Sequence, residues 1–100
     1  MTQAVQAEPN GAVESMRNLV LEIARALVDK PEEVVVDTIA ENGGTVLQLR
    51  VAAGDVGKVI GKQGRTARSL RTILGAASMK LQHRFSLDIV EEDDNGEESA

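Results

Sequence analysis

Residues 58–65 read Lys58-Val59-Ile60-Gly61-Lys62-Gln63-Gly64-Arg65, and the rest of the sequence is organised around this stretch. Two glycines enclose two long polar side chains. Glycine has no Cβ, so it permits positive φ angles and lets another molecule approach the main chain closely. An amphipathic helix is expected to begin at the second glycine, where the first N–H groups and the dipole of a helix favour an anion. The stretch therefore predicts a turn that contacts phosphate, surrounded by the cations Lys58, Lys62 and Arg65.

Two better-known phosphate-binding motifs do not fit this stretch. A P-loop requires Gly-x-x-x-x-Gly-Lys-Ser/Thr, but Gly57 lies one residue too close to Gly61, and Gln63 replaces the hydroxyl that binds magnesium. A dinucleotide-binding turn requires Gly-x-Gly-x-x-Gly, and Val59 occupies the position of its first glycine. A bare Gly-x-x-Gly is a common loop pattern, so the interpretation depends on the elements that surround it.

Length and composition exclude several classes of protein. One hundred residues favour a single domain. There is no cysteine, which excludes a disulfide, a thiolate metal site and a cysteine nucleophile. Phe85 is the single aromatic residue, which argues against folds that stack bases on aromatic platforms. The sequence has neither a signal peptide at residues 1–13 nor the roughly 20 apolar residues that cross a bilayer, so we expect a cytoplasmic protein with no membrane partner.

The charged residues are divided between two segments. The net charge is −5, which by itself argues against a nucleic-acid partner. Residues 57–84, however, hold seven lysines and arginines and no acid, whereas residues 87–100 hold seven acids and no lysine or arginine. Local patches, rather than the total charge, govern electrostatic recognition. The sequence therefore predicts a basic segment followed by an acidic tail.

The N-terminal third of the chain predicts a leader and a helix. Residues 1–13 are small and polar and predict a disordered leader. From Met16 onward the apolar residues recur with the spacing of a helix that buries one face. Ser15 can serve as the N-cap of this helix, and Pro31 marks its end.

The next segments predict a hairpin and two further helices. Residues 33–40 and 45–51 are rich in β-branched or alternating apolar residues and flank a reversal signal at residues 42–44, so they predict antiparallel strands. Asp55 is expected to cap a short helix at residues 56–60. The helix after the glycine turn carries its apolar residues on one face: Ala67, Leu70, Ile73, Leu74, Ala77 and Leu81. Three arginines fall on roughly the opposite face, at positions 65, 68 and 71, and residues 85–89 alternate as a third strand would.

The motif and the order of elements together resemble KH domains. The residues Val59-Ile60-Gly61-Lys62-Gln63-Gly64 are similar to the Val-Ile-Gly-x-x-Gly signature of that family, and the predicted order is the α-β-β-α-α-β arrangement of type II KH domains. The resemblance covers residues 14–90 and implies an α+β fold in which a three-stranded sheet packs on helices. Within the family, the chain is most similar to the small single-domain bacterial KH proteins of the KhpA type.

The resemblance also implies a site and a ligand. In KH domains the Gly-x-x-Gly loop clamps the backbone of about four single-stranded nucleotides. We therefore expect Gly61 and Gly64 to let an RNA strand approach, and Lys62 and Gln63 to project from the tip of the loop. Attraction of phosphates is assigned to three flanking cations, Lys58, Arg65 and Arg68.

The same resemblance implies how the groove is built and what the protein does. Ile60 is expected to pack beneath the loop and to fix its angle, and the second strand, near residues 47–51, to form the opposite wall. A narrow groove reads few bases, which suits an RNA chaperone or a post-transcriptional regulator with no catalytic residue, metal or cofactor. The resemblance implies a homodimer, or a heterodimer with a larger Jag-type KH protein.

Other interpretations stay open at the level of sequence. The KH scaffold can act as a protein-interaction module in which RNA contact is incidental, or as a ribosome-associated factor. Residues 91–100 are most simply a solvated, disordered acidic tail. The abrupt change of charge sign also suggests a second hypothesis, in which the tail folds over the basic face and competes with RNA.

Overall fold

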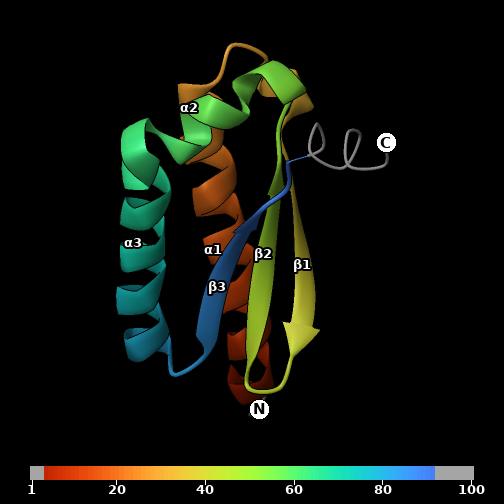
Figure 1. Cartoon of the computed structure of the whole chain (residues 1–100). Helices are drawn as coiled ribbons and strands as arrows, with labels where there is room; N and C mark the ends of the chain where they lie inside the picture. The colour runs from red at the N-terminus through yellow and green to blue at the C-terminus, as the bar shows by residue number, and fades with distance from the viewer. Residues whose placement is uncertain (1–3, 92–100) are drawn as a thin grey trace.

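The computed structural model describes the backbone of residues 4–91 and the side chains of residues 11–91; residues 1–3 and 92–100, and with them most of the expected acidic tail, lie outside the described part. The elements follow in the order α1 (Ala4–Leu27), β1 (Val35–Glu41), β2 (Gly44–Arg50), α2 (Val56–Ile60), α3 (Arg65–Leu81) and β3 (Arg84–Ile89). Short 3₁₀ turns lie at Pro31–Glu33, Ala53–Asp55 and Lys62–Gly64. The expected α-β-β-α-α-β order is confirmed (Figure 1).

The three strands form one sheet in the order β1-β2-β3, with β2 in the centre. β1 and β2 pair antiparallel, with Val36 opposite Leu49, and β2 and β3 pair parallel, with Leu47 opposite Leu87. A tight turn cannot join parallel strands, so the chain crosses from β2 to β3 through α2 and α3. Helices α1 and α3 cover one face of the sheet (Figure 1).

The core lies between this covered face and the helices. The alternation predicted for the second strand is confirmed, because Leu47 and Leu49 are fully buried while Val46 and Gln48 are half-exposed. Val59 of α2 is also fully buried and anchors the short helix in front of the glycine turn. The long helices contribute buried side chains to the same cluster: Val20, Ala24, Leu70 and Leu74.

Two residues that the sequence analysis assigned to the core face of α3 are exposed instead. Ile73 is 47% exposed and Leu81 is 37% exposed, whereas Ala67, Leu70 and Leu74 are buried. Successive residues of a helix are separated by about 100° around its axis, which places Ile73 outside the arc centred on Leu70 and Leu74, whereas Leu81 lies within this arc but is the last residue of α3. The apolar face predicted from the sequence is therefore wider than the face that the sheet covers.

Helix α1 begins earlier than the sequence predicts. Residues 4–13, expected to belong to a disordered leader, form its first turns, and Ser15 lies inside the helix and is not its N-cap. Ala12 and Val13 pack against the hydrophobic core, and this contact outweighs the roughly 1 kcal/mol that a glycine such as Gly11 costs in a helix. The limits of the domain at residues 14 and 90 stay a prediction.

A buried carboxylate connects the start of α2 to the turn after α1. The sequence predicts Asp55 as the cap of α2, but its side chain makes no capping hydrogen bond. Asp55 is only 3% exposed, and its Oδ2 accepts a hydrogen bond of 3.0 Å from the Lys30 N–H. The segment that leads into the glycine turn is thereby fixed to the connection between α1 and β1.

Candidate nucleic-acid interface

The glycine stretch forms the tight turn that joins α2 to α3. Gly61 has φ 81° and ψ 169°, Gln63 has φ 56° and ψ 27°, and Gly64 has φ 73° and ψ 14°. The main chain closes the turn by itself, because the Gly61 N–H donates to the Gly57 carbonyl (2.8 Å) and the Gly64 N–H donates to the Gly61 carbonyl (3.0 Å). The positive φ angles produce an abrupt change of direction between the two helices.

The two glycines of the turn are required for different reasons. The conformation of Gly61 belongs to a region that is essentially restricted to glycine, and a Cβ there would lie 2.7 Å from Thr66 Cβ and 2.8 Å from the Thr66 nitrogen. Gly61 therefore lets the turn pack against the start of α3. A Cβ on Gly64 would meet no atom within 4 Å. Gly64 is thus the glycine whose outer side a ligand can approach, and its left-handed φ favours glycine over a residue with a Cβ.

The polar side chains around the turn point in different directions and have different partners. Lys62 and Gln63 are exposed at the tip. The Arg65 Nη2 donates a hydrogen bond of 3.2 Å to Gln63 Oε1, which holds the guanidinium beside the turn. Lys58 is directed elsewhere, since its Nζ lies 3.7 Å from Asp29 Oδ2 in the connection after α1. Lys58 therefore adds positive charge to α2 without facing α3.

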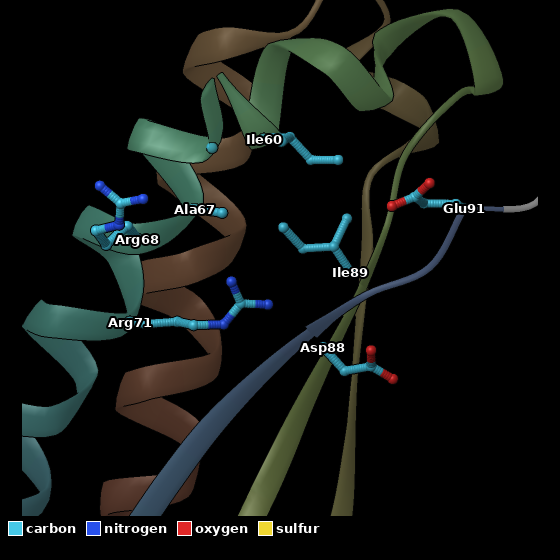
Figure 2. A pocket seen from close by; sticks show the side chains of 8 residues that line it. Ile60, Ala67, Arg68, Arg71, Asp88, Ile89 and Glu91 are labelled. Carbon is cyan, nitrogen blue, oxygen red and sulfur yellow. The ribbon is translucent and has the colours of Figure 1, made fainter. Parts of the chain in front are cut away.

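An open hollow of about 540 Å³ lies beside the turn, between α3 and the end of β3. Figure 2 shows the side chains of Ile60 and Ile89 pointing into it, where they form an apolar surface. Arg68 and Arg71 line the hollow from α3 and make that side positively charged. The remaining lining residues are Gly64, Ala67, Asp88 and Glu91.

Side chains of α3 also cover the outer edge of β3. This strand pairs with β2 on one side only, and an outer strand presents main-chain groups that need other partners. The Phe85 N–H donates to Ser78 Oγ (2.9 Å), and the Leu87 carbonyl accepts a hydrogen bond from Arg71 Nη2 (3.2 Å). Arg71 is thereby held between α3 and β3 at the border of the hollow.

The wall of the hollow that faces α3 comes from β3 and not from β2. This wall was expected near residues 47–51, but Leu47 and Leu49 are fully buried and none of these residues lines the hollow. β2 is the central strand, so β3 lies between it and α3. The error arose because the sequence indicates where strands begin and end but not which strands are neighbours.

The structure brings three of the expected site residues to the hollow: Ile60, Gly64 and Arg68. Four others form the adjoining turn or the start of α3, namely Gly61, Lys62, Gln63 and Arg65, and Lys58 lies apart. Ile60 does not pack beneath the loop as expected; its neighbour Val59 takes the fully buried position, and Ile60 faces the hollow.

Five residues that line the hollow were not among the site residues expected from the sequence: Ala67, Arg71, Asp88, Ile89 and Glu91. Arg71 follows Arg68 at the i, i+3 spacing that places two side chains on one side of a helix, and this signal was available. The residues of β3 and its end carried no comparable signal, because their place beside α3 depends on the pairing of the strands.

Two kinds of feature are absent from the part of the chain that the structure describes. Within residues 4–91, no group of three or more histidine, cysteine, aspartate or glutamate residues could hold a metal ion. None of the described helices combines the length and the apolar character that a membrane span requires.

The fold and the turn together define a class of protein. An α-β-β-α-α-β domain in which a Gly-x-x-Gly turn joins its two consecutive helices is a KH domain of type II. The family described as KhpA/KhpB, KH domain, matches residues 17–89, and the chain belongs to this family. The resemblance stated from the sequence is thereby confirmed.

Several named relatives match the greater part of the chain. The RNA-binding protein KhpA of Treponema pallidum is 55% identical over 73 residues, which are 73% of this chain and 91% of that protein. The RNA-binding protein KhpA of Borreliella burgdorferi is 46% identical over 69% of this chain and 84% of its own length. The protein of the same name from Clostridium perfringens is 44% identical over 75% of this chain and its entire length. No solved structure matches the chain.

Alanine substitutions should separate the roles of the glycines in this region. Gly61→Ala is expected to lower the free energy of unfolding by about 2–4 kcal/mol, because it adds backbone strain and overlap with Thr66. Gly64→Ala should lower it by only about 1–2 kcal/mol, the effect of a left-handed conformation without overlap. Urea unfolding followed by circular dichroism measures both changes.

Gly57→Ala is the matched control for these variants. Gly57 lies inside α2 and a Cβ there would meet nothing within 4 Å. Alanine should therefore stabilise the fold by about 0.5–1 kcal/mol. Equal losses of stability at Gly61 and Gly64 would contradict the assignment of different roles to the two glycines.

Proposed function

We propose that this protein is a non-catalytic binder of single-stranded RNA, and that the Gly61–Gly64 turn and the adjoining hollow form its binding site. The observation that carries the proposal is an exposed glycine turn that opens onto a hollow lined by Arg68 and Arg71. The relatives named RNA-binding protein KhpA support RNA as the ligand class. Membership of the KH family supports a single strand rather than a duplex.

In this proposal the sugar-phosphate backbone lies against the turn. Gly64 leaves room on its outer side, and the first N–H groups of α3 favour a phosphate at that end of the helix. Arg68 and Arg71 attract further phosphates along α3. The bases lie toward Ile60 and Ile89, whose apolar side chains supply contact surface without a pattern of hydrogen-bonding groups. Phosphate contacts position a strand but carry no sequence information, so discrimination between sequences is weak.

Weak discrimination between RNA sequences limits the cellular roles that the site can support. A hollow of about 540 Å³ accepts few bases at a time, so a single domain of this kind binds many RNAs. We therefore infer that the protein acts as an RNA chaperone or a post-transcriptional regulator in the cytoplasm of a bacterial cell. The relatives come from bacteria and carry the name of RNA-binding proteins, which agrees with this role.

We also propose that the protein associates with a second KH domain through the outer side of α1 and α3. Leu19 and Leu27 on α1, and Ile73 and Leu81 on α3, are exposed apolar side chains. In each helix the two are eight residues, or about two turns, apart, and their directions around the helix axis differ by about 80°. The two helices lie side by side on the same face of the sheet (Figure 1). The partner is a second copy of this chain or the larger Jag-type KH protein, and the described family includes both KhpA and KhpB.

Charge reversal at the tip of the turn tests the RNA site. The double variant Lys62→Asp, Gln63→Asp places two carboxylates where the proposal places phosphate, and should weaken binding of a single-stranded RNA about tenfold or more at low salt. Fluorescence anisotropy of a labelled RNA of about eight nucleotides measures the affinity, and circular dichroism verifies that the variant is folded.

The far end of α3 offers a matched control. Lys80→Asp with Gln82→Asp changes the net charge by the same amount, and Gln82, like Gln63, has a positive φ. This variant should bind RNA nearly as well as the unmodified chain. Equal losses in the two double variants would mean that net charge, and not the turn, determines RNA binding.

Salt should weaken binding in proportion to the phosphates that are contacted. For single strands the slope of log affinity against log salt is about −0.7 per neutralised phosphate, so contacts to about three phosphates predict a loss of about twentyfold between about 50 and 200 mM salt. A titration that is insensitive to salt would exclude binding through the arginines of α3.

The association surface is tested by a charge placed within it. Ile73→Glu should weaken self-association about tenfold or more, since it buries a carboxylate in an apolar contact. Sedimentation velocity over a range of concentrations measures this change. Met79→Glu is the control, because Met79 is 81% exposed and lies about a third of a turn away on α3. A chain that is monomeric before substitution, alone and with the Jag-type protein, would overturn the proposal.

A further inference from the structure

We propose that the acidic segment that follows β3 occupies the hollow beside the Gly61–Gly64 turn when no RNA is bound, and that RNA must displace it. The segment consists of Glu91 and residues 92–100. The position of the segment in the hollow follows from the fold and the charges of the chain, whereas its effect on RNA rests on the proposed function. The hollow lined by Arg68 and Arg71 thus binds residues 91–100 of the same chain.

The path of the chain after β3 brings the segment to the hollow. The Val90 N–H donates to the Leu49 carbonyl (2.9 Å), so the main chain is held against the sheet as far as residue 90. The next residue, Glu91, lines the hollow, and its carboxylate is directed toward the interior in Figure 2. The acidic segment therefore begins inside the candidate RNA site and needs no additional length to reach it.

The charges of the segment are complementary to those of the helix across the hollow. Residues 92–100 contain five further carboxylates and no lysine or arginine. The facing side carries Arg68 and Arg71, and residues 57–84 contain no acid that could neutralise them. Asp88 is the other carboxylate at this border, and its Oδ2 accepts a hydrogen bond from Gln48 Nε2 (3.4 Å).

Because the acidic segment is tethered to the end of β3, even weak ion pairs with the arginines can hold it in the hollow. An exposed ion pair contributes little between separate molecules, but a short tether gives an effective concentration in the millimolar range. The same arginines are the ones that the proposed function assigns to phosphate, so the acidic segment and RNA cannot both occupy them. The expected result is a moderate, salt-dependent reduction of RNA affinity rather than a complete block.

The first test compares three versions of the chain, the unmodified one and two variants, by anisotropy with the same labelled single-stranded RNA. The neutral-tail chain replaces the five carboxylates, as Glu92→Gln, Asp93→Asn, Asp94→Asn, Glu97→Gln and Glu98→Gln. The relocated chain keeps this neutral tail and carries the original residues 92–98 in front of Met1, which restores the net charge of −5. Helix α1 begins at the end of the molecule opposite the turn (Figure 1), so the relocated acids start far from the hollow.

We expect the neutral-tail chain to bind RNA about three- to tenfold more tightly than the unmodified chain at about 50 mM salt, and less than about twofold more tightly at about 500 mM. The relocated chain should bind like the neutral-tail chain. If the relocated chain binds as weakly as the unmodified chain, net charge explains the effect and the proposal is wrong. Equal affinity of all three chains would also overturn it.

A second measurement tests, without RNA, whether the acidic segment occupies the hollow. Methyl NMR of isoleucine-labelled protein compares the unmodified and neutral-tail chains. Ile60 and Ile89 line the hollow and should shift, whereas Ile39, on the open face of the sheet, should not. Unchanged Ile60 and Ile89 signals would show that the acidic segment does not occupy the hollow, whatever the RNA data show. If these signals shift but the protein binds no RNA, the acidic segment does occupy the hollow and the proposed function is wrong instead.

Discussion

The contact between the Gly61 main chain and Thr66 sets the geometry on which the site depends. Gly61 has a conformation that other residues do not adopt readily, and it leaves no space for a Cβ. The helix before it is held in place by the buried Val59 and by the hydrogen bond between Asp55 and Lys30. With α2 fixed, the turn determines the direction of α3. The turn and the packing of Leu70 and Leu74 in the core together place the α3 arginines beside β3.

The sequence predicts those features of the fold that arise from local patterns. The bounds of α2, the register of burial in β2 and the order of the elements follow from apolar spacing and turn residues, and all agree with the structure. The family signature identifies the turn because Gly61 has a conformation essentially restricted to glycine and Gly64 a left-handed one that favours glycine. The exposed position of Lys62 and Gln63 follows from the same geometry.

Features that depend on contacts between distant residues were not predictable in this way. Asp55 finds its partner at Lys30, 25 residues away, and local sequence suggested a helix cap instead. The start of α1 depends on the packing of Val13 against the core, which outweighs an unfavourable local composition. The hollow lies between α3 and β3. The β3 residues that line it are brought there by the parallel pairing of β3 with β2, and this pairing cannot be read from either segment alone.

Arg71, one of the two arginines that line the hollow, also limits how the sheet can grow. At the outer edge of β3, Arg71 donates a hydrogen bond to the Leu87 carbonyl, and Ser78 Oγ accepts one from the Phe85 N–H. On the other outer strand, Arg17 Nε of α1 donates to the Val36 carbonyl (3.0 Å). An outer strand with free main-chain groups is a template for strand addition by another chain and hence for aggregation. The helices therefore interrupt hydrogen bonding at both margins of this small sheet, which opposes fibre formation at high protein concentration.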